Sequence, residues 1–144
     1  MRIEKHGRKQ AGFTLIEIMV VVVILAILGA VVVPNLLGNV DEARITKAQT
    51  DIGTIEQALD MYRLNNSFYP TEEQGLEALV TKPSGSPEPK KWKQYIKELP
   101  KDPWGEEYIY EIDGDKITIL SYGSDLQEGG DGTAADITNW NEQE

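Results

Sequence analysis

The chain opens with a long apolar run and continues with a segment in which apolar and polar residues alternate at helical spacing. From Ile18 to Val33 no side chain is charged or strongly polar, and no charge at all falls between Glu17 and Asp41. As an α-helix, this uncharged stretch is about 35 Å long at about 1.5 Å per residue. A hydrocarbon core is about 30 Å thick, so the pattern predicts a membrane-spanning helix.

The segment after the apolar run carries one apolar stripe. Its members recur every three or four positions, as one face of a helix requires: Ile45, Ala48, Ile52, Ile55, Leu59 and Tyr62. Charged residues mostly occupy the other positions. The stripe is too short to indicate a coiled coil by itself, and we expect it to pack on the chain's own globular domain.

Proline and glycine mark the irregular points of this helix. Pro34 removes a backbone donor and clashes with the preceding turn, and Gly38 follows it, so we expect a kink or a locally loosened helix at 34–38. Asn65-Asn66 marks the expected end, which Pro70 enforces. One helix would then run from about residue 13 to residue 64.

A short second helix is expected after this spine. Thr71 and Gln74 form a capping-box pattern, in which each side chain can bond the other residue's backbone N–H. Leu76, Leu79 and Val80 follow at the spacing of a short amphipathic face.

The C-terminal half reads as turns and strands. Residues 99–105 are turn-rich, with Trp104 as an expected anchor into the core. Residues 108–122 read as a hairpin with Asp113-Gly114 as the turn signal, and 135–140 can add a third strand or an extended segment. One long helix lying against a small antiparallel sheet makes the fold α+β.

Composition and charge narrow the chemistry. The chain has no cysteine, and its one histidine, His6, lies in the N-terminal basic segment. Disulfides, thiol nucleophiles and cysteine-based metal sites are excluded, and histidine-based sites are disfavoured. The net charge is −10 although residues 1–12 are net positive, so the body is strongly acidic. Such a body argues against nucleic acid as a partner and is compatible with binding cations.

The N-terminal segment allows more than one interpretation. By the positive-inside rule, the basic flank at 1–12 stays cytoplasmic and the acidic body lies on the far side. An ordinary secretory signal has a short apolar core and a small-x-small cleavage site, whereas this run is long and Gly29-Ala30 is only a weak site. A plain signal anchor does not explain Glu17, because an unpaired ionisable residue in a membrane segment costs several kcal/mol.

The stretch KQAGFTLIEIMVVVVILAIL resembles the class III signal of type IV pilins and pseudopilins. That pattern has a short basic leader, Gly at the cut, Phe next and Glu five residues after the Gly, and Gly12, Phe13 and Glu17 match it. The resemblance implies that a prepilin peptidase cuts between Gly12 and Phe13 and methylates the new amine. The apolar helix then stays attached as the assembly domain.

Processing of this kind gives Glu17 a partner. Cleavage would create an α-ammonium on Phe13, and in a polymer of staggered helices Glu17 of one subunit can reach the Phe13 amine of a neighbour. The two charges would neutralise each other where the dielectric is low. Whether the pair forms between subunits, within one subunit or only during docking stays open at this point.

The body resembles one branch of the same superfamily. The stretches ALDMYRLNNSFYPTEEQGLEAL, LPKDPWGEEYIY, SYGSDLQEGG and DITNW look like the major pseudopilins of the type II secretion system. With the N-terminus, the resemblance covers nearly the whole chain. It implies a type IV pilin-like fold with a loop-rich C-terminal region, divided into a leader (1–12), a transmembrane assembly helix (13–37) and a periplasmic domain (38–144).

The resemblance implies a structural subunit and not an enzyme. Such a subunit is a single-pass protein of the bacterial inner membrane with a cytoplasmic N-terminus. It polymerises into a short periplasmic pseudopilus that drives folded exoproteins through an outer-membrane channel. The implied partners are further copies of the chain, minor pseudopilins, the prepilin peptidase, the inner-membrane assembly platform and the exoproteins.

The loop SYGSDLQEGGDGTAAD (121–136) packs three aspartates, a glutamate and four glycines. Carboxylates and exposed carbonyls suit calcium, although the residues alone favour a solvated acidic turn. The resemblance implies a structural calcium ion that replaces the missing disulfide as a staple. The positions that match its ligands are Asp125 and Asp136, the backbone oxygens of Tyr122 and Gln127, and, less closely, Thr133 and Asp131. Leu126 departs from the pattern, because Gly is common at this position.

Two other functions are consistent with parts of the sequence. A type IV or competence pilin would share the N-terminus but form a long extracellular filament. A membrane-anchored enzyme, for example a glycosidase with paired carboxylates, would use the many acids. These acids cluster in turns and on helix surfaces, with no thiol and with the single histidine far away in sequence.

Overall fold

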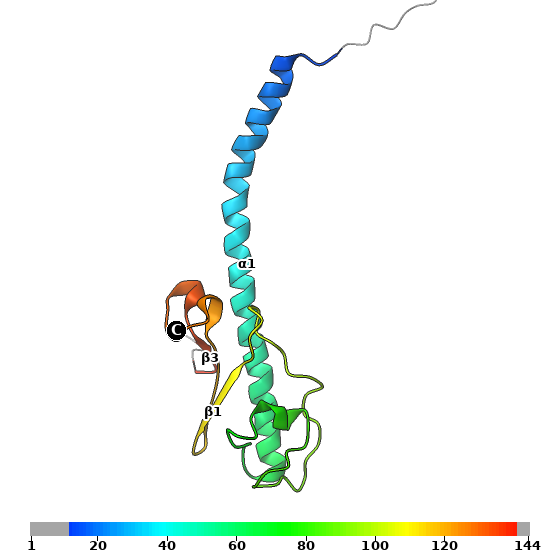
Figure 1. The fold of residues 1–144 in the computed structure, drawn as a ribbon, viewed down its shortest axis with the longest axis vertical. Helices are drawn as coiled ribbons and strands as arrows, with labels where there is room; N and C mark the ends of the chain where they lie inside the picture. The colour runs from blue at the N-terminus through cyan, green and yellow to red at the C-terminus, as the bar shows by residue number, and fades with distance from the viewer. Residues whose placement is uncertain (1–11, 141–144) are drawn as a thin grey trace, which may run out of the picture. The chain divides into compact units, whose positions relative to one another are not determined.

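The computed structural model describes residues 12–140, without the side chains of residues 32–37 and 39. Its elements in chain order are α1 (Leu15–Asn66), η1 (Leu76–Leu79), β1 (Ile109–Asp113), β2 (Lys116–Ser121), η2 (Gly123–Asp125), η3 (Gly132–Ala134) and β3 (Ile137–Thr138), where η denotes a 3-10 helix (Figure 1). They fall into two compact units that divide between Asn39 and Val40. The α+β class expected from the sequence is confirmed.

The N-terminal unit contains the first part of α1, whose described apolar side chains face outward on all sides. Every large apolar side chain from Phe13 to Val31 is at least 49% exposed. A contiguous apolar surface of this extent marks a site of interaction with another protein or with lipid. Within the residues that the structure describes, no helix has the length and hydropathy that crossing a membrane requires.

Three predictions about the N-terminal part of the chain stay predictions. α1 is helical without a break through residues 34–38, but the side chain of Pro34 lies outside the described residues, and the kink expected at Pro34 and Gly38 is not tested. Residues 1–11 of the expected leader also lie outside them. The domain boundary expected after residue 37 is not tested either, although the two compact units divide nearby, between residues 39 and 40.

The second part of α1 forms one wall of the body, and its predicted apolar stripe is confirmed. Ala48, Ile55, Leu59 and Tyr62 have no exposed surface, and Ile52 retains only 2%. They share one hydrophobic core with residues of the sheet and of η1, and Ile45 packs at the edge of this core. The stripe therefore packs on its own domain, and the helix ends at Asn66, close to the expected position.

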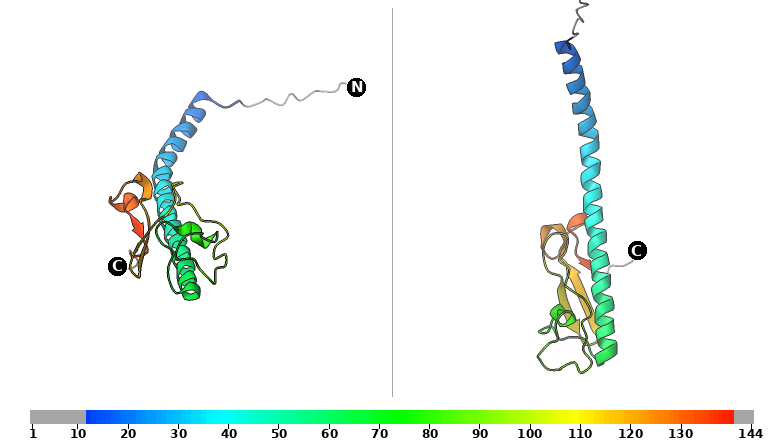
Figure 2. Two further views of the ribbon diagram at one scale, coloured as in Figure 1. Left: turned by 60° about the horizontal axis from the view of Figure 1, so that its bottom comes forward. Right: turned by 90° about the vertical axis from the view of Figure 1, so that its right-hand side faces the viewer.

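A three-stranded antiparallel sheet lies along this part of α1 (Figure 2). β1 and β2 form the predicted hairpin, with Asp113 paired to Lys116, and β2 pairs with β3 through Ser121 and Ile137. The two-residue loop is therefore Gly114-Asp115, one position later than the predicted turn. Gly114 at its first position has φ +60°, the left-handed conformation that glycine adopts without steric cost.

The short helix expected after Thr71 is present as a 3-10 helix that begins later than the capping box. The capping-box bonds are present, since Thr71 N–H donates to Gln74 Oε1 at 3.1 Å and Gln74 N–H donates to Thr71 Oγ1 at 3.2 Å. Gly75 then takes φ +57°, which an α-helix cannot contain, and the chain continues as the four-residue 3-10 helix η1. Its leucines, Leu76 and Leu79, are still buried as expected.

Tyrosine hydroxyls tie the β1 region to α1 and to the loop that follows α1. Tyr108 donates to Asp51 Oδ2 at 2.9 Å, and Tyr110 donates to the carbonyl of Pro70 at 2.8 Å. Burial raises the pKa of both Tyr108 and Tyr110 well above the usual range, and for Tyr108 the bond to Asp51 adds to this. Both hydroxyls therefore keep the proton that they donate throughout the physiological pH range.

The buried stripe predicts a large effect of truncating one of its members. Leu59→Ala removes a fully buried side chain and should lower the free energy of unfolding by about 3 kcal/mol. Leu64→Ala, on the same helix but 76% exposed, should change it by less than about 0.5 kcal/mol. Urea unfolding of the full chain in detergent, followed by tryptophan fluorescence, measures both. Equal losses in the two variants would contradict the assignment of the core.

Candidate functional site

The first candidate site is the beginning of α1, where Glu17 is held by Thr14. Thr14 donates to Glu17 Oε2 from its backbone N–H at 2.7 Å and from its hydroxyl at 3.0 Å. Glu17 N–H donates back to Thr14 Oγ1 at 3.3 Å. These are the reciprocal bonds of a capping box, with Thr14 at the N-cap and Glu17 three residues later. Glu17 therefore satisfies the first turn of its own helix.

Phe13 and Gly12 precede this cap in non-helical backbone. Phe13 is 85% exposed, and its side chain lines the same shallow apolar groove as Ile16, Glu17 and Val20. Phe13 and Glu17, four residues apart, thus line one groove, and the Gly12–Phe13 peptide bond lies outside the helix. A bond in irregular backbone is easier for a peptidase to engage than one within a helix.

Sequence reasoning missed Thr14 as part of this site. The signal was available, because T-x-x-E ahead of an apolar run is a capping-box pattern of the kind recognised at Thr71.

The second candidate site is the acidic loop between β2 and β3. η2 and η3 lie against each other, so the two arms of the loop are close. Asp125 Oδ1 accepts from Gln127 N–H at 3.1 Å, and Asp136 Oδ2 accepts from Gly129 N–H at 2.9 Å. A Cβ at Gly123 would lie 2.8 Å from the carbonyl oxygen of Ala135 and 3.2 Å from that of Thr133. Glycine thus allows one arm to approach the carbonyls of the other.

This donor set consists of oxygen atoms, as calcium prefers. Among residues 12–140 no three His, Cys, Asp or Glu side chains gather closely enough to hold a metal by themselves. A calcium ion here would need backbone carbonyls beside Asp125 and Asp136, and the close approach of the two arms supplies such carbonyls, that of Thr133 included. Asp131 is exposed, and its carbonyl accepts from Ala134 N–H at 3.1 Å. The residues present fit the ion, with Asp131 as the least engaged of the predicted positions.

The backbone conformation of Leu126 explains why glycine suits this position. It takes φ +59° and ψ 28°, the left-handed region that a branched side chain enters only with strain, and 47% of it is exposed. The chain turns sharply here after η2, directly beside Asp125 and Gln127. The departure from the family pattern leaves the turn in place and adds local strain to it.

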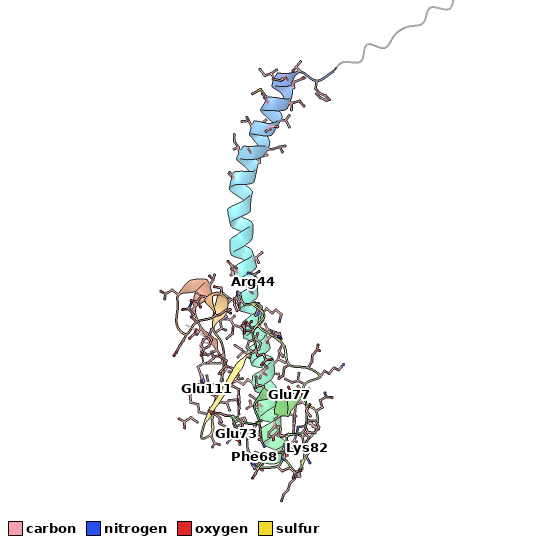
Figure 3. The ribbon with its side chains drawn as sticks, viewed as in Figure 1. Arg44, Phe68, Glu73, Glu77, Lys82 and Glu111 are labelled. Atoms are coloured by element: carbon pink, nitrogen blue, oxygen red, sulfur yellow. The ribbon has the colours of Figure 1, made fainter. Side chains whose placement is uncertain are left out.

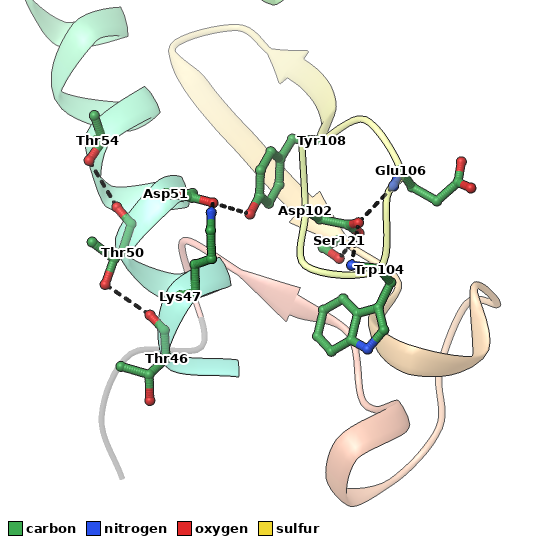
Figure 4. Close-up of polar contacts among 10 residues, drawn as sticks. All are labelled: Thr46, Lys47, Thr50, Asp51, Thr54, Asp102, Trp104, Glu106, Tyr108 and Ser121. Carbon is green, nitrogen blue, oxygen red and sulfur yellow. Dashed lines mark hydrogen bonds and ion pairs between the residues drawn. The ribbon is translucent and has the colours of Figure 1, made fainter. Parts of the chain in front are cut away.

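A buried carboxylate lies next to the start of this loop. Asp102 is 5% exposed and accepts from the hydroxyl of Ser121 at 2.6 Å (Figure 4). The backbone N–H groups of Trp104 and Glu106 donate to its other oxygen at 3.1 and 2.8 Å. The Trp104 side chain is half-buried against the core, so the expected anchor is confirmed in part. Sequence reasoning did not single out Asp102 or Ser121, because only the fold brings them together.

Several other acids of the body lie on its surface. Glu73, Glu77 and Glu111 come from the turn before η1, from η1 and from β1, and all three are exposed (Figure 3). Exposed acids on separate elements keep a surface soluble and negatively charged.

Two family models match this chain, one over its N-terminal region and one over its body. The prokaryotic N-terminal methylation motif matches residues 7–33, and the family model "Type II secretion system (T2SS), protein G" matches residues 35–140. The chain is 61% identical over 144 residues to type II secretion system core protein G of Vibrio cholerae serotype O1, with 97% of this chain and 98% of that protein covered. It is 50% identical over 136 residues to the core protein G of Escherichia coli K12, with 92% of each covered.

A solved structure extends the agreement to the fold. The crystal structure of the major pseudopilin from the type 2 secretion system of enterohaemorrhagic Escherichia coli has a TM-score of 0.63 and 49% sequence identity. The match covers 76% of this chain and 96% of that chain. A methylation motif, an exposed apolar helix and a small α+β body together define a pilin-like protein. Within that class, the chain belongs to the type II secretion system protein G family, the family of the major pseudopilins.

The capping box at Thr14 predicts a local effect on the start of α1. Thr14→Ala removes the N-cap hydroxyl and should cost about 1 kcal/mol at the first turn, whereas Thr14→Ser keeps the bonds. Hydrogen–deuterium exchange of the first helical turn in detergent measures this. We expect about fivefold faster exchange in the alanine variant and unchanged exchange in the serine variant. Unchanged exchange in both would contradict the capping role of Thr14.

Proposed function

We propose that this chain is the structural subunit of the periplasmic pseudopilus of a type II secretion system. It polymerises to drive the export of folded proteins across the outer membrane. The observation that carries this proposal is the apolar first part of α1, exposed on all sides and headed by Glu17, in a member of the protein G family. Packing against the same segment of other copies would cover this surface, as a filament core requires.

The apolar segment has a second role before assembly. In this proposal it anchors the chain once in the bacterial inner membrane, with residues 1–12 in the cytoplasm and the body in the periplasm. The methylation motif over residues 7–33 supports a membrane-anchored precursor whose leader is removed. The prepilin peptidase would cut between Gly12 and Phe13 and methylate the Phe13 amine.

Glu17 is the residue that would align subunits during assembly. Both donors of Thr14 bind Oε2 of Glu17 in the described residues, so Oε1 can still accept from the methylated Phe13 amine of a neighbour. Removing Glu17 would leave that amine buried without a counter-charge, which costs several kcal/mol in an apolar environment. The capping box and the intersubunit pair are therefore compatible uses of one carboxylate.

The partners that follow from this role are other proteins. Copies of the chain form the filament, with minor pseudopilins and the inner-membrane assembly platform as further components and exoproteins as the cargo. The acidic composition disfavours nucleic acid. A catalytic role is not part of the proposal, and the reported relatives favour a pseudopilin over a type IV or competence pilin.

A structural calcium ion is the second part of the proposal. Asp125 and Asp136 would hold it together with backbone oxygens of Tyr122, Gln127 and Thr133, and Asp131 would add a nearby charge. The ion would join the two arms of a loop that contains no disulfide. The support is the oxygen-only donor set and the close approach of the arms at Gly123.

The assembly role predicts the outcome of replacing Glu17. Glu17→Ala should reduce the yield of sheared filaments and the secretion of exoproteins at least tenfold, since a buried amine is left unpaired. Glu42→Ala, an exposed acid on the body's part of α1, serves as the matched control and should assemble normally. Immunoblots of sheared filaments from cells that lack the native subunit measure the yield. Normal assembly by the Glu17→Ala variant would contradict the proposed assembly role.

The calcium site predicts a change in thermal stability. At a calcium concentration 100-fold above Kd, binding should stabilise the fold by about 2.7 kcal/mol, which corresponds to a Tm about 10 °C above that in chelator. Asp125→Asn and Asp136→Asn should abolish the difference. Asp113→Asn, at the exposed end of β1, should preserve it. A wild-type chain with the same Tm in calcium and in chelator would contradict the proposed calcium site.

A further inference from the structure

Asp102 is the buried acid that the proposed function does not use. It is 5% exposed, and in the described part of the chain its carboxylate has no ion-pair partner within 4.0 Å. Burying such a charge is costly unless hydrogen bonds replace its hydration. Three donors do so here, namely the N–H groups of Trp104 and Glu106 and the hydroxyl of Ser121.

The turn around Asp102 fixes the direction of this carboxylate. Asp102 N–H donates to the carbonyl of Glu106 at 2.8 Å, and Gly105 N–H donates to the carbonyl of Asp102 at 3.0 Å. Lys101 and Glu107 pair as an isolated antiparallel bridge at the base of the turn. One carboxylate oxygen is occupied within the turn, so the other is presented to Ser121.

Ser121 carries the connection into the acidic loop. It is 2% exposed at the end of β2, and its hydroxyl donates to Asp102 Oδ2 at 2.6 Å. The same Oγ atom accepts from Gly123 N–H at 3.3 Å. A chain of hydrogen bonds therefore runs from the 101–107 turn through Ser121 to the first residue of η2.

Gly123 is where this chain meets the proposed calcium site. It lies between Tyr122 and Asp125 with φ +70°, and a Cβ added to it would lie 2.8 Å from the carbonyl oxygen of Ala135 and 3.2 Å from that of Thr133, so its position limits how closely the two arms approach. A shift of Gly123 would move the oxygens of both arms relative to one another. Metal affinity is sensitive to such shifts, because residues behind the ligands typically change it by about 10- to 100-fold.

We propose that Asp102 and Ser121 are positioning residues for calcium: their buried hydrogen bond holds Gly123 against the second arm of the loop and so sets the arrangement of the ligand oxygens. Neither residue is a ligand in this inference. The inference rests on the calcium site proposed above.

Calcium titration of the full chain in detergent tests the inference. Isothermal titration calorimetry at 20 °C gives Kd, and circular dichroism confirms that each variant is folded at that temperature. Ser121→Ala and Asp102→Asn should raise the calcium Kd at least tenfold. Ser121→Thr keeps the hydroxyl and should remain within about threefold of the wild type.

Ile117→Val separates positioning from general stability. Ile117 lies in the same strand and is 4% exposed, so this variant should lower the Tm in chelator and leave the calcium Kd unchanged. If wild type binds calcium and Ser121→Ala binds it with an unchanged Kd, the positioning role is overturned while the calcium site stands. An equal rise of Kd in Ile117→Val also overturns it. A wild-type chain that does not bind calcium overturns both proposals.

Discussion

The contact between the apolar face of α1 and the sheet holds the body together. The sheet has three strands, of which β3 contains only two residues, and a sheet this small is marginal without a packed face. Ile55 and Leu59 of the helix, fully buried, share a core with Ile117 and Ile119 of β2. The loops that surround this core depend on it for their positions. Tyr108 reaches Asp51 of α1, and Asn139 after β3 reaches Glu56 of α1 at 2.9 Å.

The first part of α1 differs from the second part in that its described apolar side chains are exposed and not buried. Its described apolar side chains cover the whole circumference and remain exposed in the single chain, as the proposed roles of membrane anchor and filament core would require. Glu17 is the one acid at the start of this segment. Thr14 satisfies it locally, so the helix begins with a hydrogen-bonded carboxylate rather than an isolated charge. An amine created by processing would then complete the site.

The sequence predicted the parts of the fold that depend on periodicity and turn chemistry. The stripe from Ala48 to Tyr62, the helix end at Asn66 and the hairpin followed from spacing, from Pro70 and from glycine. The short helix expected after Thr71 begins only at Leu76 and is a 3-10 helix, because the left-handed φ of Gly75 follows the capping box. The hydrogen bond between Asp102 and Ser121 joins residues 19 positions apart, one in the 101–107 turn and the other at the end of β2. No local pattern reveals such a contact, whereas Gly12, Phe13 and Glu17 form a contiguous motif.

The central claim is that one helix, freed of its leader at Gly12, serves as membrane anchor and filament core. Intact-mass spectrometry of the chain from the membrane fraction of its host tests this most directly. The account predicts a protein that begins at a singly N-methylated Phe13 and retains the whole of α1. A chain that keeps Met1, or one that begins after the apolar run, would contradict it.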